Sequence, residues 1–181
     1  MIVLMGMKHC GKTTLGRLLA DRRGEAFIDL DGFAEDIAAR QRGRPAGVRE
    51  IYRDGGKDAF QALEAEALRK IAADFPQGKA ALVLALGGGT IENPSGLAAL
   101  EGRGLFVFLD QDEDVLFARI ASSGLPPFLQ APDPKAAFHA LYEKRVFLYR
   151  KKADLTVDMR DKSPQAALEH LAARRELRRG G

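Results

Sequence analysis

Residues 6–14 constrain this chain more than any other segment, because they read Gly-Met-Lys-His-Cys-Gly-Lys-Thr-Thr. They fit the pattern G-x-x-x-x-G-K-[ST], a phosphate-binding loop that requires a strand before it and a helix after it. An apolar run at 2–5 predicts the strand, and leucines at helical spacing in 13–21 predict the helix. The alternative, a glycine-containing turn that binds nothing, leaves the lysine and the threonine unexplained.

The glycines of such a loop let successive backbone N–H groups converge on one anion, and the following helix adds its positive N-terminal end. Lys12 can reach the β- and γ-phosphates and the Thr13 hydroxyl can ligate Mg²⁺, so we expect ATP and Mg²⁺. Two adjacent residues, His9 and Cys10, do not make a metal-ligand set, and we expect their backbone to bind the phosphates. The predicted nucleotide-binding residues of the loop are Gly6, Lys8, Cys10, Gly11, Lys12, Thr13 and Thr14.

Composition narrows the class of partner. The 181 residues carry a formal net charge of +3 and no tryptophan, which is weak support for a nucleic-acid-binding surface. No apolar run approaches the ~20 residues of a membrane span. The single cysteine cannot form an internal disulfide, which favours a reducing cytoplasm. We expect one domain, 1–181, that is a cytoplasmic monomer and binds small molecules rather than nucleic acid or membrane.

A predicted strand at 26–31 ends in two carboxylates, Asp29 and Asp31, which lie on the same side of an extended chain. Next to a phosphate-binding loop, one carboxylate can hold Mg²⁺ and the other can accept a substrate hydroxyl. The alternative is that Asp31 caps a helix over 33–40. Residues 40–57 are rich in arginine, and this composition favours a solvated loop over a flap that covers an anionic substrate. A helix is predicted over 60–75.

A fully apolar run at 81–86 predicts a central strand, and Gly87, Gly88 and Gly89 follow it directly. Glycines at the carboxyl end of a buried strand allow a ligand to approach the backbone, at the edge where open α/β sheets bind ligands. A flexible turn is the alternative. The next predicted elements are a short helix at 94–100, a strand at 105–109, a helix at 112–122, a proline-rich stretch typical of lids, a helix at about 135–151, a strand at 154–158 and a helix at 164–174.

Arg145 falls on the apolar stripe of the predicted helix at 135–151. An arginine on an inward face usually pairs with a carboxylate. The sequence leaves open whether that carboxylate belongs to the protein or to a ligand.

The phosphate-binding loop, Asp29-Leu30-Asp31, Gly87-Gly88-Gly89 and Lys144-Arg145-x-x-Leu148-Tyr149 occur in this order, and the chain therefore resembles the shikimate kinase family. The resemblance covers nearly the whole chain. It implies an α/β, three-layer P-loop kinase fold: a five-stranded parallel sheet flanked by helices, with a substrate-binding segment at about 31–62 and a mobile lid at about 122–134. It also implies transfer of the ATP γ-phosphoryl group to the 3-hydroxyl of shikimate, with Mg²⁺.

The resemblance also implies roles for individual residues. Lys12 acts on the phosphates and Asp31 orients the attacking hydroxyl, so these two are the predicted catalytic residues. Thr13 and Asp29 are the predicted magnesium-associated pair, and Arg119 and Pro164 sandwich adenine. The predicted substrate-binding residues are Asp31, Gly87, Gly88, Gly89 and Arg145.

Two positions depart from the family pattern. Gln61 stands where the pattern F-R-x-x-E has an arginine that binds the acceptor carboxylate, and Pro126 stands where R-P-L-L has a lid arginine. We expect a cation from 40–57 or from the lid helix to substitute. The other hypotheses are a kinase of this fold for another small hydroxy acid or polyol, and a nucleotide-binding protein that has lost phosphoryl transfer.

Overall fold

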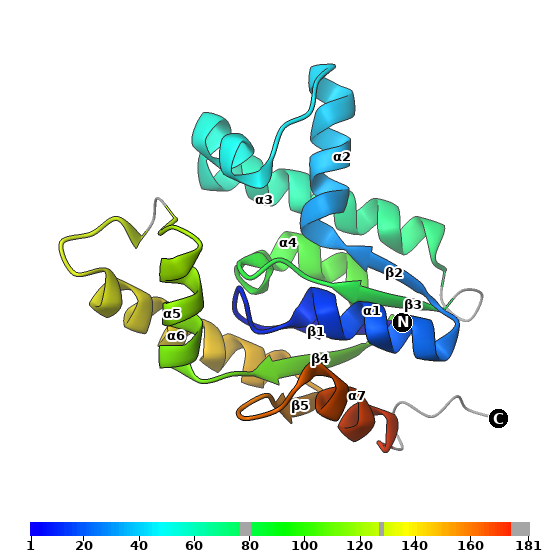
Figure 1. The fold of residues 1–181 in the computed structure, drawn as a ribbon. Coiled ribbons are helices and arrows are strands. Elements are labelled where there is room, and N and C mark those ends of the chain that lie inside the picture. The colour runs from blue at the N-terminus through cyan, green and yellow to red at the C-terminus, as the bar shows by residue number, and fades with distance from the viewer. Residues whose placement is uncertain (77–80, 127–128, 175–181) are drawn as a thin grey trace.

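A single parallel sheet organises the computed structural model, which describes residues 1–76, 81–126 and 129–174. Its five strands lie in the order β2-β3-β1-β4-β5, which confirms the expected five-stranded parallel sheet (Figure 1). The strands are β1 (Ile2–Met5), β2 (Ala26–Asp29), β3 (Leu82–Ala85), β4 (Leu105–Asp110) and β5 (Leu155–Asp158).

The sheet forms where the apolar runs predict it, because short runs of branched and aromatic side chains bury both faces of a central strand. All residues of β1 and β3 are buried. In the register, Leu4 of β1 lies between Ala85 of β3 and Val107 of β4. Parallel pairing brings the carboxyl ends of the strands to one edge, where the loops that carry polar residues begin.

Helices cover both faces of the sheet and complete three layers (Figure 1). On one face α1 packs against α7, and on the other α3 packs against α4 while α6 packs against β4. The helices are α1 (Lys12–Arg23), α2 (Leu30–Arg42), α3 (Val48–Asp74), α4 (Pro94–Leu97), α5 (Glu113–Ser122), α6 (Pro134–Lys152) and α7 (Pro164–Ala172), with 3₁₀ turns η1 (Thr90–Glu92) and η2 (Ala98–Leu100).

The strand predicted over 26–31 is shorter than expected, and the predicted helix cap is at a different residue. Strand β2 ends at Asp29, and Asp31 already belongs to the first turn of α2. The reason is that Asp29 itself caps α2: its Oδ1 accepts the backbone N–H of Asp31 at 3.1 Å. A carboxylate in this position satisfies an N–H group that the helix leaves without a partner.

The basic segment 40–57 is mostly helical, so the prediction of a solvated loop is wrong. Helix α2 continues to Arg42, and α3 begins at Val48 and extends through the predicted helix 60–75. Glu35 accepts the backbone N–H of Val48 at 2.7 Å, and Ile51 is buried in the core. Helix α3 bends at Gly56, whose φ of 71° and ψ of −170° are not helical. A left-handed φ of this kind suits glycine, which has no Cβ to strain.

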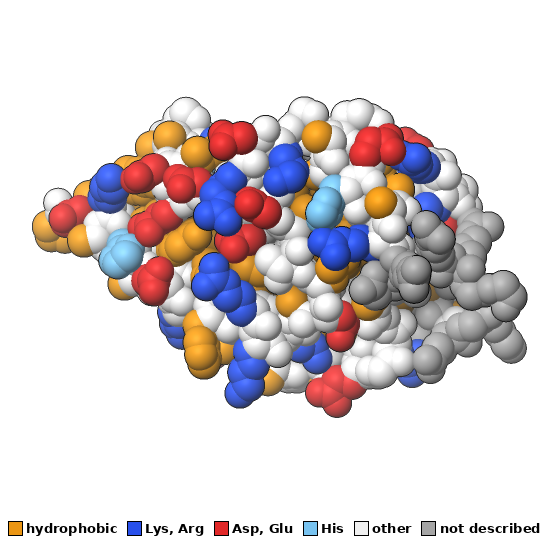
Figure 2. Space-filling model, turned by 90° about the horizontal axis from the view of Figure 1, so that it is seen from below, with side chains coloured by type: hydrophobic (Ala, Val, Ile, Leu, Met, Phe, Trp, Pro, Cys, Tyr) orange, Lys and Arg blue, Asp and Glu red, His pale blue; other side chains and the backbone are white. Residues whose placement is uncertain are grey.

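The other predicted helices agree with the structure to within a few residues, including α6, predicted at about 135–151. Figure 2, a view from below Figure 1, shows basic and acidic side chains interspersed over this face. Within the part of the chain that the structure describes, no helix is long and apolar enough to cross a membrane.

Candidate active site

The phosphate-binding loop adopts a conformation that its two glycines make possible. Gly6 has a φ of 151° and Gly11 a φ of 101°, both in the region that favours glycine. A Cβ at Gly6 would also lie 2.8 Å from the Cys10 Sγ and 2.8 Å from the Leu109 carbonyl oxygen. The loop therefore packs tightly between β4 and the start of α1, and its position relative to the sheet is set by the backbone.

Lys12 lies inside this loop rather than on the surface. Its Nζ donates to the carbonyl oxygens of Gly6 and Met7, each at 2.9 Å, and the residue is 9% exposed. The side chain of Cys10 is buried beside it, with the Sγ 3.8 Å from the Lys12 Nζ. This arrangement holds an ammonium group at the centre of the loop, where the phosphates of a bound nucleotide would meet it.

Thr13 and Asp29, the two predicted metal-associated residues, are in contact. The Thr13 hydroxyl donates to the Asp29 Oδ2 at 2.6 Å, although the two residues come from different elements, α1 and β2. A hydroxyl and a carboxylate are hard oxygen ligands of the kind that Mg²⁺ prefers, directly or through water. The pair fits a magnesium site at the start of α1.

Asp31 is a partly buried carboxylate at the start of α2, beside the glycine segment. A Cβ at Gly87 would lie 2.5 Å from the Asp31 Oδ1 and 3.2 Å from the Glu64 Oε1. Burial, and then the charge of Asp29, raise the pKa of Asp31, and nearby Lys12 and Lys8 only partly oppose this. A carboxylate with a raised pKa accepts a proton more readily near neutral pH, which suits a general base.

The three glycines after β3 allow close packing on every side. A Cβ at Gly88 would lie 2.9 Å from the backbone nitrogen of Lys8, and one at Gly89 would lie 3.3 Å from an Nη atom of Arg145. The segment thus runs between the phosphate-binding loop and α6. Close approach, rather than flexibility of a turn, accounts for the glycines.

Glu64 fixes this glycine segment to α3, a role that the sequence analysis missed. Its Oε1 accepts the Thr90 hydroxyl at 2.6 Å and its Oε2 accepts the Asn93 amide at 3.2 Å. Glu64 is 1% exposed, and burial raises its pKa although both hydrogen bonds lower it. An acidic residue one turn after Phe60, on the apolar face of the predicted helix, was the available signal.

Arg145 pairs with a carboxylate of the protein. Its Nε and one Nη donate to the Glu92 Oε2 at 2.9 and 2.8 Å, and the Lys144 Nζ lies 2.5 Å from the Glu92 Oε1. The side chains of Arg145 and Glu92 are 14% and 10% exposed. Burial raises the pKa of Glu92, but the hydrogen bonds from Lys144 and Arg145 outweigh it and lower the pKa overall.

This pairing answers the question that the sequence left open about Arg145, in favour of the protein's own carboxylate. Glu92 was not among the predicted site residues. It lies in η1, three residues after the last glycine, and no local pattern marks it as a partner of α6. The predicted contact of Arg145 with a substrate carboxylate stays a prediction.

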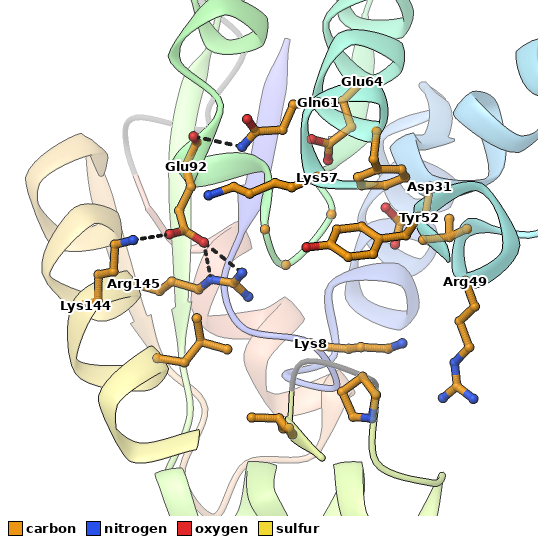
Figure 3. Close-up of a pocket in the computed structure, with 18 of the residues that line it drawn as sticks. Lys8, Asp31, Arg49, Tyr52, Lys57, Gln61, Glu64, Glu92, Lys144 and Arg145 are labelled. Carbon is orange, nitrogen blue, oxygen red and sulfur yellow. Dashed lines mark hydrogen bonds and ion pairs between the residues drawn. The ribbon is translucent and has the colours of Figure 1, made fainter. Parts of the chain in front are cut away.

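A pocket of about 530 Å³ joins these groups (Figure 3). The phosphate-binding loop contributes Lys8, α2 contributes Asp31, and the glycine segment and η1 form one wall. Helices α3 and α6 contribute the residues Val48, Arg49, Tyr52, Lys57, Phe60, Gln61, Glu64, Ala137, Ala140, Leu141, Lys144 and Arg145. Such a concave, largely apolar pocket with a few convergent charges is typical of a small-molecule site.

The cations of the former basic segment divide into two groups. Arg44 pairs with Glu50 and Arg53 pairs with Asp54, and neither arginine lines the pocket. Arg49 and Lys57 line it. Gln61, at the position of an expected arginine, donates its amide to the backbone oxygen of Glu92 at 3.1 Å.

The remaining predicted residues lie around the loop and the lid. An Nη of Arg119 donates to the His9 carbonyl oxygen at 2.9 Å, and Pro164 begins α7. A sandwich of adenine between these two residues stays a prediction. In the lid, Pro126 and Leu129 line the pocket, while Pro127 and Phe128 lie outside the described residues.

Comparison with known proteins agrees with this geometry. A family model described as shikimate kinase matches residues 8–175. A shikimate kinase of Synechococcus sp. (strain CC9605) is 36% identical over 169 residues, covering 93% of this chain and 78% of that protein. One of Mycobacterium marinum is 32% identical over 172 residues, covering 95% and 87%. A solved structure of shikimate kinase from Acinetobacter baumannii in complex with shikimate has a TM-score of 0.80 at 28% identity, covering 94% of this chain and 89% of that chain.

Proposed function

The chain belongs to the shikimate kinase family, and on that premise we propose that it transfers the γ-phosphoryl group of ATP to the 3-hydroxyl of shikimate. The observation that carries this proposal is the position of Asp31. Its partly buried carboxylate lines the pocket, against Gly87 and beside the Thr13–Asp29 pair. A hydroxyl that is held by Asp31 would face the end of a triphosphate that is held by the loop.

On the nucleotide side, the backbone N–H groups of the loop and the start of α1 hold the phosphates, and Lys12 neutralises charge on them. Thr13 and Asp29 would hold Mg²⁺, which would supply neutralisation of the negative charge on the phosphates. Arg119 fastens α5 to the loop through the His9 carbonyl and is proposed, with Pro164, to flank adenine.

On the acceptor side, Asp31 orients the hydroxyl and takes its proton, while the bond from the hydroxyl oxygen to the γ-phosphorus forms and the bond from phosphorus to the departing ADP breaks. The glycine segment, including Gly88 and Gly89, presents its backbone to the acceptor, and Glu64 keeps that segment in place. Positioning and charge neutralisation, rather than a covalent intermediate, carry the reaction.

Arg49 is our candidate for the work of the missing lid arginine. It lines the pocket from the start of α3, and an Nη of Arg49 donates to the backbone oxygens of Ser123 and Gly124 at 3.5 and 3.3 Å. Its charge is one of those that lower the pKa of His9 in the loop, after burial and the charges of Lys8, Lys12 and Arg119. Arg49 therefore lies between the lid and the pocket, and we assign to it the neutralisation of charge on the transferring group.

A second candidate function is phosphorylation of a small polyol or of a different hydroxy acid. Glu92 favours it, because its carboxylate already accepts hydrogen bonds from the Nε and one Nη of Arg145, the arginine proposed to bind the acceptor carboxylate. Under this function the acceptor would need no carboxylate at that end of the pocket.

We propose a single kinase domain over 1–181, with a substrate-binding segment at about 31–62 and a lid at about 122–134. Its support is that one pocket takes residues from the phosphate-binding loop, α2, α3, the glycine segment, the lid and α6. We propose a monomer in the cytoplasm. The buried cysteine, Cys10, is compatible with a reducing compartment.

A coupled assay of ADP release tests the proposed function. The purified protein is given ATP, Mg²⁺ and, in separate reactions, shikimate, quinate, a polyol panel or no acceptor. We expect turnover with shikimate well above the rate without acceptor. Turnover with a polyol and none with shikimate would transfer the proposal to the second candidate, and binding of ATP without any turnover would support a nucleotide-binding protein instead.

A further inference from the structure

The guanidinium of Arg145 has one edge bound and one edge open. The Nε and one Nη donate to a single oxygen of Glu92, so this carboxylate occupies the edge of the guanidinium that contains Nε. An arginine has five N–H donors in a planar fork, so further donors remain for a second partner. No other hydrogen bond of Arg145 with the described residues is formed, and the residue lines the pocket beside Gly89. Glu92 thereby holds the guanidinium of Arg145 where it extends into the pocket (Figure 3).

Lys57 is a second cation at the same end of the pocket. It makes no hydrogen bond or ion pair within the part of the chain that the structure describes, although most cations of the neighbouring segment are paired. Figure 3 shows its side chain extending across the pocket toward Glu92 and Arg145. An ammonium group that extends into a pocket and lacks a protein partner is a donor for a ligand.

The bend in α3 explains how Lys57 comes to this place. Lys57 directly follows Gly56, where the helix changes direction, and precedes Gln61 by one helical turn. Residues four apart lie on the same face of a helix, so Lys57 and Gln61 face the same part of the pocket. Gln61 is neutral, and its side-chain amide already donates to the Glu92 backbone oxygen, while its backbone oxygen accepts the Asn93 amide. The charge that is absent at Gln61 is thus present one turn earlier.

The balance of charge at this end favours an anionic group on the acceptor. Glu92 carries one negative charge against the positive charges of Lys144 and Arg145, and Lys57 adds another positive charge. The other acids of the pocket, Asp31 and Glu64, lie against Gly87, and Glu64 already accepts hydrogen bonds from Thr90 and Asn93. A carboxylate at this end would meet an ammonium and the open edge of a guanidinium, which is a strong combination for carboxylate binding.

We propose that Lys57 and the open edge of Arg145 together bind the carboxylate of the acceptor, with Glu92 holding Arg145 in the orientation that this requires. The proposal rests on the proposed function and deepens it, because it selects a hydroxy acid over a neutral polyol. It also assigns the carboxylate contact to Lys57 in a chain where Gln61 cannot supply it.

A thermodynamic cycle tests the contact between Lys57 and the carboxylate. Wild type, Lys57→Ala and Lys57→Arg are assayed with shikimate and with its methyl ester, which keeps the ring hydroxyls and removes the charge. For shikimate, Lys57→Ala should raise KM about 10- to 100-fold, the range expected for a lost hydrogen bond between charged groups, while kcat and the KM for ATP stay nearly constant. For the ester the same substitution should change KM little, and Lys57→Arg should restore most of the binding of shikimate.

The control is Arg53→Ala, which removes an exposed cation from the same helix without touching the pocket. It should leave both KM values unchanged. An equal effect of Lys57→Ala on the acid and on the ester, or no effect on either, would overturn the proposal. Because Lys57 has no protein partner in the described chain, its replacement should not change the melting temperature.

The same cycle is measured as binding, by calorimetry with each acceptor, so that it does not depend on turnover. If the wild type binds shikimate, shows the cycle and yet transfers no phosphoryl group, the proposed function fails and the binding inference stands. If it phosphorylates shikimate and the ester equally well, the proposed function stands and the inference fails. If the wild type binds neither acceptor, the inference is overturned as well.

Discussion

The two halves of the site are built in different ways. On the nucleotide side, Lys12 donates to carbonyl oxygens only five and six residues away in the chain, and the loop is one continuous segment. On the acceptor side, Arg145 donates to Glu92 across 53 residues, and Tyr149 of the same helix donates to the Gly88 oxygen across 61. A local motif makes the first half, and packing of α2, α3, η1 and α6 makes the second.

The halves also differ in how they treat charge. The nucleotide side presents an ammonium and backbone N–H groups to its ligand. The acceptor side places acids and bases against one another, and Glu92 is paired twice before any ligand arrives. The first arrangement suits any triphosphate, whereas the second makes specificity depend on which protein contacts a substrate can share or displace.

The largest effect is expected on the nucleotide side, from Lys12→Ala. Loss of the ammonium at the centre of the loop should lower kcat/KM by at least about 10³-fold, because charge on the transferring group is then poorly neutralised. ATP with Mg²⁺ should also protect the variant from heating much less than it protects the wild type. A differential scan with and without nucleotide measures this, and a variant that keeps a tenth of wild-type activity would show that the loop works in another way.

Asp31→Asn should lower kcat by about 10²- to 10⁴-fold, the range of a lost general base, while the KM for ATP changes little. The same variant should be more heat-stable than the wild type at neutral pH. Burial and the charge of Asp29 raise the pKa of Asp31, so the folded protein binds this proton more readily than the unfolded chain does. Ionisation of Asp31 therefore costs stability above its folded pKa.

The stability difference between Asp31→Asn and wild type should shrink as pH falls through the folded pKa of Asp31 and vanish below its unfolded value. Melting temperatures across roughly pH 3 to 8 provide the measurement, because this range extends below the unfolded pKa of an aspartate, about 3.9. A variant that is less stable than the wild type at every pH would mean that Asp31 is a structural partner rather than a general base whose ionisation costs stability.

Arg49→Ala tests whether this arginine acts on the phosphoryl group as it passes from the nucleotide side to the acceptor side. If Arg49 neutralises the transferring group, kcat should fall about 10- to 100-fold, with smaller changes in the KM of either substrate. Arg44→Ala is the matched control, since Arg44 is an exposed arginine of the same segment that pairs with Glu50 outside the pocket. Equal losses in the two variants would point to a general effect of surface charge.

The smallest effect is expected on stability, from Glu92→Ala. The substitution leaves the guanidinium of Arg145 half-enclosed without its carboxylate, which should cost about 1–3 kcal/mol in the free energy of unfolding. Urea denaturation measures the change. Glu169→Ala removes an exposed carboxylate that pairs with Arg22 and should change stability little by comparison. No difference between the two variants would indicate that Glu92 serves the ligand rather than the fold.

The local parts of this site could be predicted from the sequence and the long-range parts could not. The loop follows from a spaced motif, because the geometry of a strand, a turn and a helix is nearly determined by their residues. Thr13 and Asp29 were assigned to Mg²⁺ by the resemblance, and only the structure shows that they are in contact. The end of β2 was misplaced by two residues because capping by Asp29 competes with strand alternation. The helical start of α3 was not predicted, because a charge-rich composition does not show which charges will pair. The ion pair between Arg42 and Asp54 is one that stabilises this region.

Spacing of residues alone determined that this chain has a parallel sheet, a phosphate-binding loop and a glycine segment at the same edge. Only the tertiary structure decided what the inward arginine of α6 contacts, since Glu92 arrives from a 3₁₀ turn with no periodicity of its own. It likewise decided which cation of the basic segment enters the pocket, because the bend at Gly56 directs Lys57 inward. Short sequence patterns determine local backbone geometry, whereas the pairing of charges that are distant in sequence depends on how whole helices pack.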